Sequence, residues 1–287
     1  MADEKLVSLL LSDVAEWNQF RKGSDQKDCC DLTDATLFKA YLPYADLRTA
    51  DLRKAVLSFA HLPGAKLCNA NLSGADLRDA DLTEAYLRHS NLARANLSHA
   101  TMGGADLSAA NLRGANLRGA YLRDSILVEV NLSEADLRGA DLLKADLRRA
   151  NMSGADLGNA LLLEAVLKQA DLSRVNLSEA NLVRVDLAGA GLREARLAGA
   201  RLIGADLRGA DLRGTDLRGA CLLSANLCEA DLRGAELGEA SFYQAVLNGA
   251  KVGQDQLLKA RTLFNAKIDT DKTEGLEKIA PHLFSQA

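Results

Sequence analysis

The sequence predicts an all-β solenoid, a chain wound into stacked coils with short, nearly straight sides, and three observations support this. An apolar residue, nearly always Leu, recurs at every fifth position from Leu32 to Leu247 without a change of frame. Small residues, mostly Ala, lie two positions before it. Aromatic residues make up only 4% of the 287 residues, although hydrophobic residues make up 48%. The core is therefore expected to be narrow and regular.

The repeating unit reads Ala-(Asp/Asn)-Leu-x-x and occurs 44 times in succession. Its centre is Leu in 41 units, and the exceptions are Met102, Met152 and Phe242. The position two before the centre is Ala in 37 units. The remaining units have another small or modest side chain there: Cys30, Ser90, Ser125, Val130, Val175, Val185 or Thr215. Leu and Ala are thus the candidate core.

Neither a helix nor a continuous strand buries this pattern. On an α-helix, five residues advance a side chain by about 140°, so successive Leu residues would spiral around the cylinder. Along a continuous strand, side chains alternate with a period of two, so an odd period of five would place successive Leu residues on opposite faces. The chain must therefore turn a corner in every unit to keep Leu and Ala inside.

The number of sides per coil follows from the residues just before the centres, because residues stacked one coil apart should resemble each other. Steps of 20 from Asp51 give an unbroken polar ladder: Asn71, Asn91, Asn111, Asn131, Asn151 and Asp171. Steps of 15 from Asn71 give no such order, since they reach Tyr86, Thr101 and Leu161. Four sides per coil are therefore predicted. At roughly 4.8 Å between parallel strands, about eleven coils would extend on the order of 50 Å.

Two runs of the repeat resemble the pentapeptide repeat family. They are Ala-Asp-Leu-Arg-Asp-Ala-Asp-Leu-Thr-Glu-Ala at 75–85 and Ala-Asn-Leu-Arg-Gly-Ala-Tyr-Leu-Arg-Asp at 115–124. The resemblance implies a right-handed quadrilateral β-helix, with the central Leu and the Ala two positions before it inside and the other three positions outside. It implies little about biochemical function, because most members of the family have no assigned activity.

Both ends depart from the repeat and are expected to be short helical caps. Residues 3 to about 22 carry apolar residues spaced mostly for one helical face, including Trp17 and Phe20. A helix over an open solenoid end would cover apolar side chains and unpaired backbone groups and prevent end-to-end stacking. Partner recognition is the alternative role. After Leu247 the repeat decays, and residues 254–264 and 274–284 are predicted to be two further helices.

The predicted domains are therefore an N-terminal helical cap at 1–28, the β-helix at 29–250 and a C-terminal helical cap at 251–287. The apolar residues of the second predicted cap are Leu257, Leu258, Leu263, Leu276, Ile279, Leu283 and Phe284. Both flanks resemble the helical segments that are common among cyanobacterial members of the family.

Charge and composition exclude several classes of protein. The net charge of −4 is too balanced for a protein that binds nucleic acid directly, because that requires a basic surface. No run of eighteen apolar residues and no basic start leading into an apolar segment are present, so neither membrane insertion nor export is expected. The five cysteines, Cys29, Cys30, Cys68, Cys221 and Cys228, contain no CxxC motif. A reducing, cytoplasmic location is predicted.

The sequence offers no catalytic or cofactor motif, and the protein is predicted not to be an enzyme and to hold neither metal nor cofactor. His61, His89, His99 and His282 include no HExxH pattern. No P-loop, Rossmann glycine pattern or GxSxG motif occurs. The many carboxylates recur at one slot of the repeat, where they are expected to bond the backbone at the corners. Frequent Gly after the centre likewise suits tight corners.

One outward column is apolar and is the candidate binding surface. Steps of 20 from Leu143 give Leu163, Val183, Ile203, Leu223 and Tyr243, and Leu161 lies beside them. The same column earlier in the chain reads Pro43, Pro63, Thr83, Gly103 and Arg123. Elsewhere, Arg or Lys follows the centre in 15 units and suggests a solvated, charge-alternating surface. An apolar ladder of this length marks a contact with a protein partner or a second copy, unless a terminal segment covers it.

Two functions compete on this basis. The first is a non-enzymatic interaction scaffold or regulatory adaptor that presents its rigid surface to an unidentified protein partner. The second comes from the resemblance, since some pentapeptide repeat proteins mimic double-stranded DNA and bind DNA gyrase or another type II topoisomerase. Mimicry requires a markedly anionic surface. Residues 29–250 carry 28 acidic and 25 basic side chains, a net of −3, which favours the scaffold.

Overall fold

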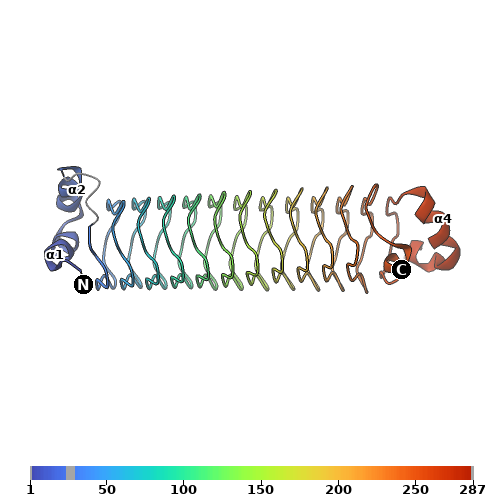
Figure 1. Cartoon of the computed structure of the whole chain (residues 1–287), viewed down its shortest axis with the longest axis horizontal. Coiled ribbons are helices and arrows are strands. Elements are labelled where there is room, and N and C mark those ends of the chain that lie inside the picture. Colours follow the sequence, from blue (N-terminus) through green and yellow to red (C-terminus); the bar gives the residue numbers. More distant parts are fainter. Residues whose placement is uncertain (1, 24–29, 286–287) are drawn as a thin grey trace. The chain divides into compact units, whose positions relative to one another are not determined.

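The computed structural model describes residues 2–23 and 30–285, which form two compact units, Met1–Asp146 and Leu147–Ala287. Each unit contains stacked coils and one helical end (Figure 1). Cys29 and the predicted limit between residues 28 and 29 lie outside the described residues, and the three domain limits stay predictions. No helix in the described ranges is both long and apolar enough to cross a membrane.

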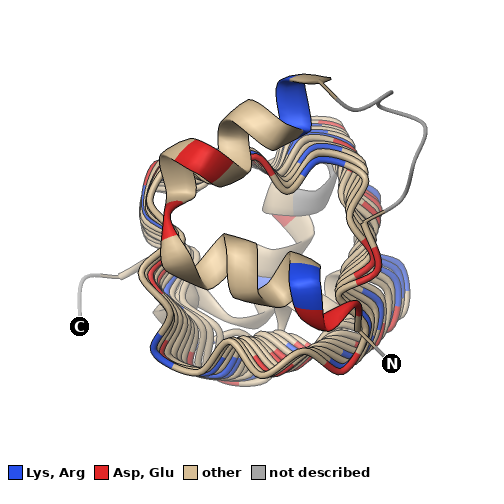
Figure 2. Cartoon of the chain, turned by 90° about the vertical axis from the view of Figure 1, so that its left-hand side faces the viewer, with Lys and Arg blue, Asp and Glu red and all other residues tan. Residues whose placement is uncertain are grey.

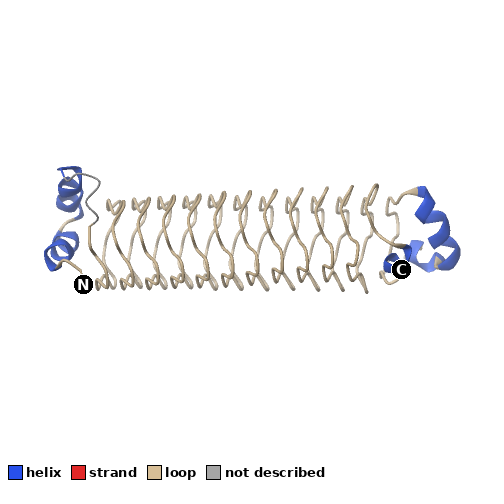
Figure 3. Ribbon diagram, in the orientation of Figure 1, coloured by secondary structure: helices blue, strands red, loops and turns tan. Residues whose placement is uncertain are grey.

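The coils of both units have four sides of five residues each, as predicted. Within each unit, residues before the centres form parallel bridges with the residues 20 positions later, as in Asp51 with Asn71 and Asn181 with Arg201. Three backbone bonds join stacked sides, as where Leu52 N donates to Asn71 O at 2.7 Å, Asn71 N donates to Ala50 O at 2.9 Å and Lys54 N donates to Ser73 O at 3.1 Å. One bridging residue per side is too short for a continuous strand, and none forms in the described part of the chain (Figure 3). The total number of coils stays a prediction.

Each corner is a tight turn made by the two residues after the centre. The N–H of the following Ala donates back to the carbonyl of the central Leu, as from Ala75 to Leu72 at 3.0 Å. The second turn residue has a positive φ near 55–74°, a conformation that favours Gly, and Gly74 and Gly209 are examples. The predicted role of the Asp/Asn slot is confirmed, because its side chain accepts the N–H two residues on, as Asn71 does from Ser73 at 3.2 Å.

Leu and Ala fill the core as predicted. The central residues from Leu32 to Leu247 are at most 1% exposed, and the Ala positions are at most 6% exposed. Positions that depart from Leu or Ala are buried as well, since Phe242 and Thr215 are fully buried. The Thr215 hydroxyl donates to Leu192 O at 2.9 Å, so a polar side chain in the core still has a partner.

The N-terminal segment forms two helices, α1 (Glu4–Ser12) and α2 (Val14–Gly23), instead of the single predicted helix. Asp13 causes the break, because its extended backbone ends α1 while its carboxylate accepts the Ala15 N–H at 2.6 Å and the Glu16 N–H at 3.3 Å. Figure 2 shows both helices lying across the open end of the first coil.

The α2 side chains bond the exposed backbone of that first coil. The Trp17 indole N–H donates to Asp46 O at 2.9 Å, and the Asn18 amide oxygen accepts the Asp46 N–H at 2.7 Å. An Arg21 guanidinium N–H donates to Arg48 O. The α2 helix therefore supplies hydrogen-bond partners that a preceding coil would otherwise provide.

The C-terminal segment differs from its prediction in two places. The helix predicted over 254–264 is only α3 (Gln254–Leu257), because Thr262 and Lys267 again bridge to coil residues, Ser241 and Val246. These steps are 21 residues long, so α3 inserts one residue into the last coil. The helix predicted over 274–284 corresponds to α4 (Thr270–Ile279) followed by a 3-10 turn η1 (Pro281–Phe284). Leu276 and Leu283 are buried, but Ile279 is 66% exposed.

Candidate functional site

Five of the six predicted stripe residues of the second unit form one column. Leu163, Val183, Ile203, Leu223 and Tyr243 occupy the first turn position of one side in successive coils. The backbone carbonyls of the last four accept N–H groups from the preceding coil at 2.8–3.0 Å, as Ile203 O does from Arg184 and Leu223 O does from Gly204. At the spacing of coils, roughly 4.8 Å, the column extends about 20 Å.

All five side chains are partly exposed, and Leu161, two positions before Leu163, is 44% exposed. The described residues after Lys251 extend the second unit at its C-terminal end, where Phe264 lies against Tyr243, and they leave all five column residues with exposed surface (Figure 1). The seventh predicted residue, Leu143, is also partly exposed but belongs to the first compact unit.

The column continues one coil further than the sequence predicted. The Phe264 carbonyl accepts the Gln244 N–H at 2.9 Å, and the Phe264 ring lies 5.4 Å from the Tyr243 ring. A step of 20 from Tyr243 reaches Leu263, which is buried, so the extra residue of α3 concealed Phe264. We call the set Leu161, Leu163, Val183, Ile203, Leu223, Tyr243 and Phe264 the apolar stripe.

The stripe has a polar border. Along one edge of the stripe, the residues two positions before Val183 and Ile203 are Asn181 and Arg201. The Asn181 carboxamide oxygen accepts the Val183 N–H at 3.3 Å. On the other side Arg184 and Glu164 form an exposed ion pair at 3.6 Å. An apolar centre with a polar rim is the usual composition of a protein interface.

A second group of exposed apolar side chains lies in the first unit and was not predicted from the sequence. Tyr41 is 71% exposed and stacks on His61 at 5.1 Å, while Tyr44 is 68% exposed. Phe38 and Phe59 are half exposed and meet edge to face at 5.9 Å. The available signal was four aromatic residues in outward slots within 22 residues of an aromatic-poor sequence.

The rest of the surface carries many ion pairs, some within a single pentapeptide repeat and others between successive coils. Eight Arg side chains pair with the Asp two residues earlier at 2.5–2.7 Å, for example Arg233 with Asp231 and Arg53 with Asp51. The hydrogen bond from Arg233 lowers the pKa of Asp231 to about 2. The same cause lowers the pKa of Asp206 and Asp216, beside Arg208 and Arg218.

These shifts predict a loss of stability in acid. The pKa of Asp231 is lower in the folded chain than its ordinary 3.8, so the unfolded chain binds more protons between these values. The stabilisation is thus present above the ordinary value and is lost as the pH falls towards the folded value. In urea denaturation from about pH 5 to about pH 2, the Arg233→Gln variant should lose less stability than the wild type. If the free energy of unfolding fell equally with pH in both proteins, the Arg233 hydrogen bond would not be the cause of the lowered Asp231 pKa.

The described residues contain no cluster of three or more His, Cys, Asp or Glu side chains that could hold a metal ion. His61 is engaged by Asp81, with Nδ1 2.9 Å from the carboxylate. Cys30 is buried, and Cys68, Cys221 and Cys228 are partly exposed.

Comparisons with known proteins agree with the coil geometry. The family model described as pentapeptide repeats matches in eight copies between residues 30 and 253. No curated protein matches the chain. Among solved structures, the chain is similar to HetL, a pentapeptide repeat protein involved in heterocyst differentiation regulation from the cyanobacterium Nostoc sp. strain PCC 7120. The identity is 35% over 78% of this chain and 93% of HetL, with a TM-score of 0.40.

Two further structures are similar over part of the chain. A trypsin-treated form of QnrB1, a plasmid-mediated fluoroquinolone resistance protein, is 22% identical over 74% of this chain and 96% of its own, with a TM-score of 0.43. Rfr23, a pentapeptide repeat protein from the cyanobacterium Cyanothece 51142, is 33% identical over 43% of this chain and 64% of its own, with a TM-score of 0.18.

Proposed function

Because this chain belongs to the pentapeptide repeat family, and three of every five side chains in its coils face outward, we propose that it is a non-enzymatic interaction protein. Its apolar stripe binds a protein partner, and the scaffold acts as an adaptor that holds this surface rigid. The similarity to HetL, which is involved in differentiation regulation, is in keeping with a regulatory role.

The observation that carries the proposal is the stripe itself. Five first-turn residues in successive coils, from Leu163 to Tyr243, are apolar and partly exposed, and Phe264 extends them. On the other sides of the coils, the first turn position often holds an Arg that pairs with the Asp two residues earlier. Burying such a ladder against a partner would remove apolar area from water and stabilise a complex.

The competing function, binding of DNA gyrase as a DNA mimic, finds less support in the surface charges. A DNA mimic needs carboxylates that are free to act on a basic binding site. Here Asp206, Asp211, Asp216 and Asp231 each pair with the Arg two residues later in the same pentapeptide repeat. The local field of these carboxylates is therefore largely neutralised.

Affinity capture from the lysate of the source cell tests the proposal. We expect wild-type protein to retain a specific protein that the Val183→Glu/Ile203→Glu variant does not retain. Both substitutions replace partly exposed apolar side chains in adjacent coils, so they place two charges at the centre of the stripe while leaving the buried Leu182 and Leu202 in place. Size-exclusion chromatography with light scattering identifies the case in which the partner is a second copy.

The matched control is the Ser153→Glu/Ser173→Glu variant. Ser153 and Ser173 are first turn residues in adjacent coils, like Val183 and Ile203, and both are partly exposed. They lie two sides of the coil away from the stripe. This variant should retain the partner as the wild type does. If all three proteins retain the same specific partners and have the same mass in solution, the stripe is not the binding surface. Recovery of gyrase subunits by all three would favour the DNA-mimic function instead.

A further inference from the structure

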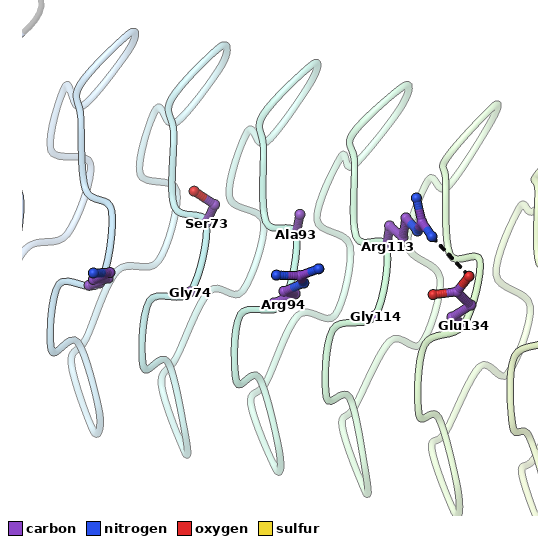
Figure 4. Close-up of a pocket in the computed structure, with 8 residues that line it drawn as sticks. Ser73, Gly74, Ala93, Arg94, Arg113, Gly114 and Glu134 are labelled. Atoms are coloured by element: carbon purple, nitrogen blue, oxygen red, sulfur yellow. Dashed lines mark hydrogen bonds and ion pairs between the residues drawn. The ribbon is translucent and has the colours of Figure 1, made fainter.

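A shallow hollow in the first unit gathers three basic side chains, of which two have no acidic partner. It has a volume of about 470 Å³ and is lined by side chains from successive coils of one side (Figure 4). The second turn position of this side reads Lys54, Gly74, Arg94, Gly114 and Glu134. Long side chains therefore alternate with glycines, which leave open space between them.

The geometry shows how the glycines create this space. A Cβ atom on Gly74 would lie 3.8 Å from Lys54 Cγ, and one on Gly114 would lie 3.8 Å from Arg94 Cγ. The stems of Lys54 and Arg94 thus lie over the glycines of the next coil. Backbone bonds fix the spacing, since Lys54 N donates to Ser73 O at 3.1 Å and Arg94 N donates to Arg113 O at 3.0 Å.

The charges of the hollow do not balance. Its lining contains Lys54, Arg94 and Arg113 against one carboxylate, Glu134, and Arg113 pairs with Glu134 at 3.0 Å. Among the residues that the structure describes, the side chains of Lys54 and Arg94 make no hydrogen bond or ion pair. The neighbouring slot adds no net charge, because Asp51 pairs with Arg53 at 2.6 Å and the next three coils hold Asn71, Asn91 and Asn111, which form an amide ladder with bonds of 3.1–3.2 Å. Two positive charges therefore remain.

We propose that this hollow binds a phosphate group. A phosphate group carries close to two negative charges at neutral pH and so matches the excess of Lys54 and Arg94, whereas a carboxylate would neutralise only one of them. Ammonium and guanidinium groups both donate charge-assisted hydrogen bonds to phosphate oxygens. The Ser73 side chain, which lines the same hollow, offers a hydroxyl donor. The phosphate belongs either to a free anion or to a phosphorylated side chain of a protein.

NMR titration of the full-length protein with inorganic phosphate tests the proposal. The amide signals of Ser73, Gly74 and Arg94 should shift and saturate, and the Lys54→Gln/Arg94→Gln variant should bind at least about tenfold more weakly. A phosphoserine peptide and its unphosphorylated form, titrated in parallel, separate the two sources. Tighter binding of the phosphopeptide identifies a modified protein, and tighter binding of inorganic phosphate identifies a free anion.

The control variant is Lys66→Gln/Arg118→Gln, which removes the same charge from the first unit outside the hollow. It should bind phosphate within about twofold of the wild type, because long-range attraction between exposed charges is screened by salt. Equal weakening in both variants, shifts that do not saturate, or equally tight binding of acetate would overturn the proposal. None of these outcomes depends on the apolar stripe, so the two proposals fail separately.

Discussion

Replacing Leu222 with Ala should lower the free energy of unfolding by about 2–5 kcal/mol, whereas replacing its neighbour Leu223 with Ala should cost less than about 1 kcal/mol. Leu222 is fully buried in the coil interior, but Leu223 is partly exposed in the apolar stripe. The same chemical change at adjacent positions thus removes core packing in one case and surface contacts in the other.

Urea denaturation followed by circular dichroism measures the difference. Neighbouring side chains cannot readily fill the cavity left by the shortened side chain at position 222. The coils on either side are already packed with Leu202 and Phe242, both fully buried. Similar losses for both variants would show that Leu223 is also part of the core. The distinction between inward and outward residues, on which the stripe depends, would then be wrong.

Replacing Trp17 with Ala should release the N-terminal helices from the first coil. Trp17 is fully buried and its indole N–H donates to Asp46 O at 2.9 Å, and loss of a buried Trp side chain typically costs about 3–5 kcal/mol. Because repeat proteins unfold locally, the loss should appear in residues near the cap. Hydrogen exchange of the Asp46 amide should therefore accelerate strongly in the variant.

Phe20→Ala provides the comparison. Phe20 is 42% exposed and its ring lies 5.9 Å from the Trp17 ring, so its removal should accelerate exchange far less. The Trp17→Ala variant should also associate as its concentration rises, because exposed backbone groups of a coil pair with other chains. Unchanged exchange at Asp46 would contradict the assignment of α2 as a cap.

The regular part of the fold was predictable because every unit repeats the same physical constraint. The Leu and Ala positions, the four sides and the backbone-bonding role of Asp and Asn each follow from a pattern that recurs in every coil. The errors occur where a single residue decides the structure. Asp13 divides one amphipathic segment into α1 and α2, and its N-terminal capping bond at 2.6 Å carries no periodic signal.

The candidate surfaces were predictable only in part for the same reason. Stepping by 20 found the stripe residues from Leu163 to Tyr243, but it missed Phe264 because α3 adds one residue to the last coil. The stacking of Tyr41 on His61 depends on how rings from two coils meet, which the repeat frame alone does not give. The hollow near Gly74 likewise depends on how the Lys54 and Arg94 side chains lie beside the open space at the glycines, which the repeat frame alone does not give.

The most direct test of the central claim, that the apolar stripe binds a protein, is site-specific photocrosslinking in the source cell. A photoreactive phenylalanine derivative at Ile203 should crosslink a specific protein on irradiation, while the same group at Ser173, two sides round the coil, should not. Light-dependent adducts of the same protein from both positions, or from neither, would contradict the assignment of the stripe as the interaction surface.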